Sequence, residues 1–133
     1  MSRRLLLVDD DQDIRTIARI ALERLGGWTV ADADSGERAL DVAATAGPFD
    51  AILLDVTMPA LDGPATLKRL RGEPSAAATP AVFLTAKVER AERERLLALG
   101  AAGVIAKPFD PLALPAALDR ILGGGTDRER AHR

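Results

Sequence analysis

The chain has 133 residues, a length that fits one domain and leaves no room for two ordinary ones. Apolar residues make up 47% and charged residues 29%, as in soluble globular proteins, and the net charge of −2 gives no electrostatic basis for binding nucleic acid. Cysteine is absent, which excludes disulfides and thiolate metal sites. No apolar stretch approaches the roughly 20 residues of a membrane span, so we expect a cytoplasmic protein that does not bind membranes.

Short apolar runs alternate along the chain with segments of helical periodicity. The runs predict strands at residues 5–8, 28–31, 50–54, 81–84 and 103–106. The helices are predicted at about 14–25, 35–46, 63–71, 88–98 and 110–122. A strand followed by a helix, five times over, indicates an α/β fold with a parallel sheet and helices on both faces. Residues 123–133 begin with three glycines and continue as a charged stretch without apolar periodicity, and we predict that this tail is disordered.

Polar side chains follow four of the five predicted strands. In chain order they are Asp9-Asp10-Asp11, Asp55, Thr85 and Lys107. In an open parallel sheet, ligands bind in the crevice beyond the carboxyl ends of the strands, so these side chains are expected to meet at one edge. Acids, a hydroxyl and an amine together suit a divalent metal ion and a phosphoryl group.

The repulsion between the three acids expected at this edge has to be offset by a positive charge. Like charges about 4 Å apart repel by several kcal/mol at an effective dielectric constant near 20, and Mg²⁺ is a hard cation that offsets such repulsion. Asp55 stands alone after a strongly apolar run and is the better candidate for a nucleophile toward phosphorus, which leaves Asp9 and Asp10 as metal holders. Lys107 and Thr85 are suited to hold phosphoryl oxygens.

Each of these residues alone also has an ordinary structural explanation. The three consecutive aspartates could simply cap the first helix, and Asp55, Thr85 or Lys107 could be an unremarkable residue at a strand end. The aspartate spacing also imitates the start of an EF-hand loop, but the glycine and glutamate that such a loop requires are replaced by Ile14 and Ile20. Joint occurrence at four strand ends favours the functional explanation.

The motifs together resemble the receiver domain of bacterial two-component response regulators. The resemblance covers residues 4–122, so we assign 1–122 to a receiver domain. It implies a flavodoxin-like sandwich with sheet order 2-1-3-4-5. The motifs that carry it are Leu6-Leu7-Val8-Asp9-Asp10-Asp11, Leu54-Asp55-Val56-Thr57-Met58-Pro59-Ala60-Leu61-Asp62-Gly63, Phe83-Leu84-Thr85-Ala86 and Ala106-Lys107-Pro108-Phe109.

This resemblance also implies a role for each residue of the site. Asp55 would accept a phosphoryl group from a histidine kinase or phosphotransfer protein. Thr85 and Lys107 would contact that group, and the Lys107–Pro108 bond would be cis. The Mg²⁺ ligands would be Asp10, Asp55 and the backbone carbonyl of Thr57, with Asp9 acting mainly through a metal-bound water.

One position departs from the family pattern. Many receivers carry tyrosine or phenylalanine three residues before the lysine, and this chain has Val104 there. A ring that turns inward on activation is therefore missing. Lys87, two residues after Thr85, could place a cation near the phosphoryl group or simply begin a solvated, charged helix.

We expect a signalling switch that acts by binding a downstream protein, not an enzyme, as a monomer or weak phosphorylation-dependent dimer. A phosphatase that used Asp55 would need a second acid where Thr57 stands. A nucleotide or flavin binder would need a phosphate-binding loop where the aspartates stand. A scaffold that keeps only the fold, or a fragment of a larger response regulator or hybrid kinase, remains the alternative.

Overall fold

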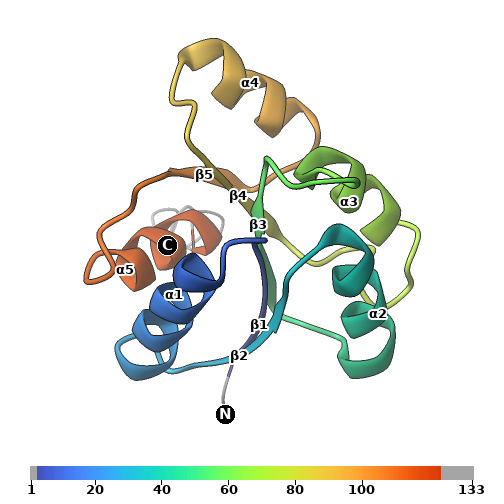
Figure 1. Cartoon of the computed structure of the whole chain (residues 1–133), viewed down its shortest axis with the longest axis horizontal. Helices are drawn as coiled ribbons and strands as arrows, with labels where there is room; N and C mark the ends of the chain where they lie inside the picture. Colours follow the sequence, from blue (N-terminus) through green and yellow to red (C-terminus); the bar gives the residue numbers. More distant parts are fainter. Residues whose placement is uncertain (1–2, 124–133) are drawn as a thin grey trace, which may run out of the picture.

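Five apolar segments form the parallel sheet, in the order β2-β1-β3-β4-β5 (Figure 1). The computed structural model describes residues 3–123. The strands are β1 (Arg3–Val8), β2 (Trp28–Ala33), β3 (Ala51–Asp55), β4 (Ala81–Thr85) and β5 (Gly103–Ala106). The helices are α1 (Gln12–Arg24), α2 (Gly36–Ala46), α3 (Gly63–Leu70), α4 (Arg90–Ala98) and α5 (Leu114–Leu122). The predicted fold class and strand order are confirmed, and none of these helices is long and apolar enough to cross a membrane.

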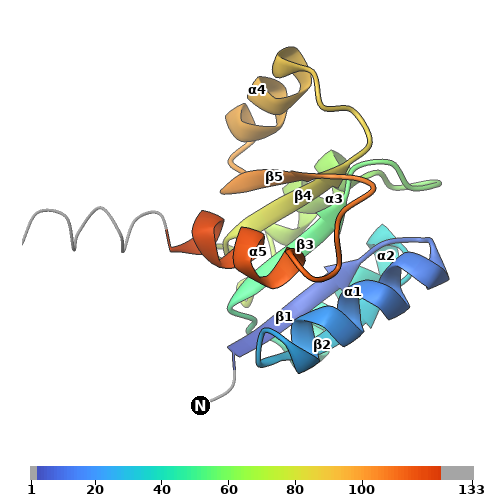
Figure 2. The same cartoon turned by 90° about the vertical axis from the view of Figure 1, so that its left-hand side faces the viewer.

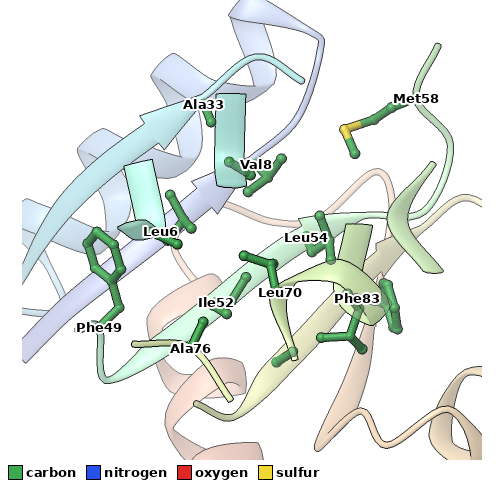
Figure 3. Close-up of a cluster of buried hydrophobic side chains, with 14 of the residues drawn as sticks. Leu6, Val8, Ala33, Phe49, Ile52, Leu54, Met58, Leu70, Ala76 and Phe83 are labelled. Carbon is green, nitrogen blue, oxygen red and sulfur yellow. The ribbon is translucent and has the colours of Figure 1, made fainter. Parts of the chain in front are cut away.

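The sheet separates two apolar clusters. Side chains alternate along each strand, so Leu5 and Leu7 face α1 and α5, while Leu6 and Val8 face α2, α3 and α4. Figure 1 shows the two groups of helices on opposite faces of the sheet, and Figure 3 shows the cluster under α2 and α3, with Leu54 near its middle. Burial on both faces is typical of parallel sheets and explains why the strand runs are continuously apolar.

Three helices begin at residues that the sequence marks as caps. The carboxylate of Asp11 accepts hydrogen bonds from the N–H groups of Asp13 and Ile14, and the Ser35 hydroxyl accepts one from Arg38. Asp62 accepts one from Ala65, at the start of α3. These bonds satisfy amide groups that have no partner inside the helix. Helix starts are local features, which is why α2 and α3 begin where the sequence predicts.

The starts of the last two helices differ from the prediction. α4 begins at Arg90 rather than at residue 88, and α5 begins at Leu114 rather than at residue 110. The Asp110 carboxylate accepts a hydrogen bond from the N–H of Leu112, which closes a turn ahead of the helix. Apart from Gly123, which follows α5, the predicted disordered tail lies outside the described residues.

Candidate functional site

The carboxyl ends of β1, β3, β4 and β5 lie at the same end of the sheet, away from the N-terminus (Figure 2). Asp55 and Thr85 are the last residues of β3 and β4, whereas Asp9 and Lys107 directly follow β1 and β5. Asp9, Asp55 and Thr85 are buried polar residues, with 0%, 4% and 3% of their surface exposed. The parallel topology thus gathers the residues that the sequence places after the strands.

The three consecutive aspartates divide into different roles. Oxygens of Asp9, Asp10 and Asp55 all lie within 4.8 Å of one another, whereas Asp11 caps α1. Capping is therefore correct for one aspartate of the run and does not account for the other two. Asp10 is exposed, which leaves its carboxylate accessible. The oxygen-rich cluster matches what a hard divalent cation binds, so the residues present fit Mg²⁺.

Lys107 is the cation that holds the buried acids together. Its Nζ lies 2.9 Å from Asp9 Oδ2 and 3.2 Å from Asp55 Oδ1. The other oxygen of Asp9 accepts a hydrogen bond of 2.9 Å from the Asp11 N–H, so both oxygens of Asp9 are engaged. The Lys107–Pro108 bond is cis, as the resemblance implies. One lysine against three acids leaves the cluster with a net negative charge.

The excess of negative charge shifts the pKa values of Asp55 and Lys107. Burial, followed by the charge of Asp9, raises the pKa of Asp55 to about 6, although Lys107 and the backbone N–H of Thr57 oppose the rise. Burial lowers the pKa of Lys107, but its hydrogen bond to Asp9 and the charges of Asp9 and Asp55 outweigh burial and raise it overall. Asp55 is therefore a carboxylate held in an unfavourable environment, next to a firmly protonated amine.

Two threonines frame the cluster. Thr57 lies exposed in the loop after β3, and its N–H donates to the carboxyl of Asp55. The buried hydroxyl of Thr85 accepts a hydrogen bond of 3.0 Å from the N–H of Lys87, which leaves the hydroxyl proton free to be donated elsewhere. The side chain of Lys87 lies with Val104 and Arg93 along a groove beside β5. Among the described residues, Lys107 and not Lys87 contacts Asp55.

Sequence reasoning missed one residue that supports the cluster. Arg15, in the second turn of α1, donates a hydrogen bond of 2.8 Å to the backbone carbonyl of Asp9, and its Nε lies 3.4 Å from Asp32 Oδ2. It thereby joins the end of β1 to β2. The sequence does show a basic residue one turn after the capping Asp11. Which acceptor Arg15 reaches could not be predicted, because that depends on how α1 packs against the sheet.

Comparisons with known proteins agree with this geometry. The family model described as "Response regulator receiver domain" matches residues 5–119. The chain is 40% identical over 122 residues to the alkaline phosphatase synthesis transcriptional regulatory protein PhoP of Bacillus subtilis, a match that covers 92% of this chain and 49% of that protein. The chain spans about half the length of the first curated relatives it matches.

Two solved structures share the fold over nearly their whole length. The chemotaxis response regulator CheY4 of Vibrio cholerae superposes with a TM-score of 0.83 at 32% identity, covering 91% of this chain and 99% of that one. The receiver domain of the sensor histidine kinase PA1611 from Pseudomonas aeruginosa does so with a TM-score of 0.79 at 31% identity, covering 92% and 99%. That structure has a magnesium ion coordinated in its active-site cleft.

Proposed function

The chain belongs to the response regulator receiver domain family of two-component signalling, and we propose that it is a phospho-accepting switch. Asp55 takes a phosphoryl group from a histidine kinase or phosphotransfer protein, and the modified site alters binding to a downstream protein. The observation that carries this proposal is the clustering of Asp9, Asp10 and Asp55 at the carboxyl end of the sheet, where Lys107 contacts Asp9 and Asp55.

Asp55 is the group suited to attack phosphorus. A carboxylate oxygen forms the new P–O bond while the P–N bond of a phosphohistidine breaks, and the imidazole nitrogen leaves with the electron pair of that bond. Burial beside Asp9 disfavours the charged carboxylate, and the ion pair with Lys107 offsets only part of this effect, so the ionised oxygen of Asp55 stays reactive toward phosphorus. Lys107 stands 3.2 Å from the attacking group and supplies a positive charge for the incoming oxygens.

Magnesium would be held by Asp10, Asp55 and the backbone carbonyl of Thr57. When bound, it neutralises charge on the phosphoryl oxygens, which is the main requirement of phosphoryl transfer. Asp9 would contribute indirectly, because Lys107 and the N–H of Asp11 already occupy its two oxygens. Arg15 orients this end of β1 through the carbonyl of Asp9.

Thr85 is the residue through which phosphorylation of Asp55 would change the conformation of the following loop. The Thr85 hydroxyl can donate a hydrogen bond to a phosphoryl oxygen on Asp55, and a shift of that hydroxyl alters its hydrogen bond with the N–H of Lys87. A bound group shifts a conformational equilibrium only by its differential affinity for the two states. Val104 provides no ring to follow the movement, so we expect the changes to concentrate in residues 85–98.

The remaining properties belong to the same proposal. The chain is not an enzyme with an external substrate: it acts on its own Asp55 and works through protein–protein contacts. It is cytoplasmic, binds neither DNA nor membranes directly, and exists as a monomer or a weak dimer formed on phosphorylation. The net charge of −2 supports the lack of a nucleic-acid surface.

Acetyl phosphate with Mg²⁺ tests the acceptor. Intact-mass measurement should show one added phosphoryl group on the wild type and none on Asp55→Ala. Equal labelling of the two proteins would refute the assignment of Asp55. Thr85→Ala is the companion variant: it should still be labelled, yet show a much weaker response of residues 85–98 in hydrogen exchange with beryllofluoride.

Asp10→Ala tests the metal ligands. The variant should fold, because removing one of three clustered acids relieves repulsion, and it should lose most of its Mg²⁺ affinity and most of its labelling. Isothermal titration with Mg²⁺ alone measures the affinity without any phosphodonor. Asp34→Ala, at an exposed acid outside the cluster, is the matched control. Wild-type Mg²⁺ affinity in Asp10→Ala would contradict the ligand assignment.

A further inference from the structure

Within residues 3–123, Asp10 is the acid of the cluster whose side chain has no partner. Asp9 and Asp55 both contact Lys107, at 2.9 and 3.2 Å. The carboxylate of Asp10 is exposed, and in this part of the chain it neither accepts a hydrogen bond nor forms an ion pair. Its position therefore depends on the backbone that carries it, which is the peptide group joining Asp9 to Asp10.

Both backbone groups of Asp9 are held by hydrogen bonds. Its N–H donates to the carbonyl of Ala33, at the end of β2, over 3.2 Å. Its carbonyl, which belongs to the peptide group leading to Asp10, accepts a hydrogen bond of 2.8 Å from Arg15 Nη1. The first bond joins two backbone groups, so no particular side chain is needed for it. The second bond comes from a side chain, so the identity of residue 15 decides whether this peptide group is fixed.

A second contact fixes the guanidinium of Arg15. Its Nε lies 3.4 Å from Asp32 Oδ2, and 16% of the Arg15 side chain is exposed. Arg19, one turn further along α1, lies 3.4 Å from the other oxygen of Asp32. Asp32 therefore holds Arg15 from the side of β2 while Arg15 holds the carbonyl of Asp9. A planar guanidinium can bridge a carboxylate and a carbonyl at once, whereas a lysine offers a single charged centre.

We propose that Arg15 is a positioning residue for the metal site. By holding the carbonyl of Asp9 it orients the peptide group that leads to Asp10, and with it the carboxylate with which Asp10 would bind Mg²⁺. Residues that orient metal ligands without touching the metal typically contribute about 10–100-fold to metal affinity. This inference deepens the proposed function, because it rests on the binding of Mg²⁺ by the acid cluster.

The charge of Arg15 by itself predicts the opposite effect on metal binding. Arg15 is a cation beside the acid cluster, and a nearby positive charge repels Mg²⁺. Its removal would also leave the negative charge of Asp32 less compensated. If Arg15 acted through its charge, a neutral variant would bind Mg²⁺ more tightly, whereas the loss of a positioning contact weakens binding. The direction of the change in affinity therefore separates the two roles.

The test is isothermal titration of the full chain with Mg²⁺ alone, at about 0.15 M salt so that distant charges are screened. Arg15→Met should weaken binding about tenfold. Asp32→Asn leaves Arg15 without its charged partner and should weaken binding about threefold. Arg19→Met is the matched control: it also removes a cation paired with Asp32, but Arg19 does not hold the carbonyl of Asp9, so Mg²⁺ affinity should match the wild type.

Two further measurements distinguish positioning from a general loss of structure. The amide nitrogen of Asp10 shares its peptide group with the carbonyl that Arg15 holds, so its NMR resonance should move in Arg15→Met without Mg²⁺ and move much less in Arg19→Met. Labelling by acetyl phosphate should need about tenfold more Mg²⁺ for its half-maximal rate in Arg15→Met. The rate at saturating Mg²⁺ should stay within about twofold of the wild type, whereas a damaged fold would lower that rate as well.

Wild-type or tighter Mg²⁺ affinity in Arg15→Met would overturn the inference, and so would an equal loss of affinity in Arg19→Met. A lower rate at saturating Mg²⁺ with an unchanged half-maximal concentration would also overturn it. If circular dichroism shows that Arg15→Met does not fold, Arg15→Lys and Asp32→Asn decide, since wild-type affinity in both would refute the positioning role.

The proposed function is judged on the wild type. A wild-type chain that acetyl phosphate and Mg²⁺ do not label at Asp55 refutes that function. A wild type that is labelled and binds Mg²⁺, beside an Arg15→Met that does so equally well, refutes only the role of Arg15.

Discussion

The carboxyl end of the sheet gathers three carboxylates around one lysine, whereas at the amino end the two arginines of β1, Arg3 and Arg4, each contact an aromatic ring and a hydrogen-bond acceptor. Arg3 stacks 4.0 Å above the ring of Trp28 and donates to Asp119 at 2.8 Å. Arg4 lies 4.7 Å from the ring of Phe49 and donates to the carbonyl of Pro48. At the carboxyl end, by contrast, Asp55 is buried with its pKa raised to about 6.

The amino end of the sheet therefore contributes to stability, and the carboxyl end carries the reactive groups. Paired charges and stacked rings lower the free energy of the folded state. Crowded acids raise it, and they are tolerated where a cation and a phosphoryl group can compensate them. Variants at the amino end should therefore lower stability without changing phosphorylation, whereas variants that remove an acid at the carboxyl end should impair phosphorylation and raise stability.

The largest effect on stability is expected at the amino end. Trp28 is 4% exposed and packs with the cluster under α1 and α5, so Trp28→Ala should lose about 3–5 kcal/mol of unfolding free energy. Urea denaturation followed by circular dichroism measures this, and Trp28→Phe should lose less. Labelling of the folded variant at Asp55 should match the wild type. A defect in labelling beyond the unfolded fraction would break the comparison.

The next effect is a gain in stability at the carboxyl end. Asp55→Asn removes a carboxyl whose pKa is about 6 in the folded protein against 3.8 unperturbed. The folded wild type therefore binds more protons than the unfolded chain between these values, and its stability falls as the pH rises through them. The variant escapes this loss, so its advantage should grow from near zero around pH 4 to about 1–3 kcal/mol at pH 8.

Chemical denaturation at the two pH values, with a chelator present, measures that gain. Asp11→Asn is a suitable control, because the side chain still caps α1 and is not part of the cluster. An advantage of equal size at both pH values would show that the charge of Asp55 is not what destabilises the folded state.

A smaller effect is expected for Arg3→Ala, which removes the stacking on Trp28 and the half-exposed ion pair with Asp119. Both interactions are weak at the surface, so the loss should be about 1 kcal/mol. Asp119→Ala alone removes the ion pair and keeps the stacking, so it separates the two contributions. If labelling at Asp55 slowed in Arg3→Ala, the two ends of the sheet would be coupled.

The smallest effect concerns the fluorescence of Trp28. This residue begins β2, and the phosphorylation site lies beyond the opposite ends of the strands. Its emission should barely change on titration with Mg²⁺ or beryllofluoride, while Asp55 becomes fully modified. A strong quench that saturates together with the modification would contradict this layout.

Local signals in the sequence predicted most of the architecture. The strands are short apolar runs, and Ser35 and Asp62 cap α2 and α3 as their positions indicate. Convergence of the strand-end residues was predictable as well, because parallel strands bring their carboxyl ends to one edge. The order of the strands entered only through the resemblance to a family and not from the periodicity.

Tertiary structure decided the contacts that give these residues their properties. Lys107 meets Asp9 across 98 positions of sequence and Arg3 meets Asp119 across 116, so both pairs depend on strand register and helix docking. The same holds for Arg15 on the carbonyl of Asp9. Helix caps and the alternation of side chains along a strand involve residues close in sequence, so the sequence alone predicts them. Ion pairs between distant residues, the burial of side chains and the resulting pKa values arise only when distant segments pack together.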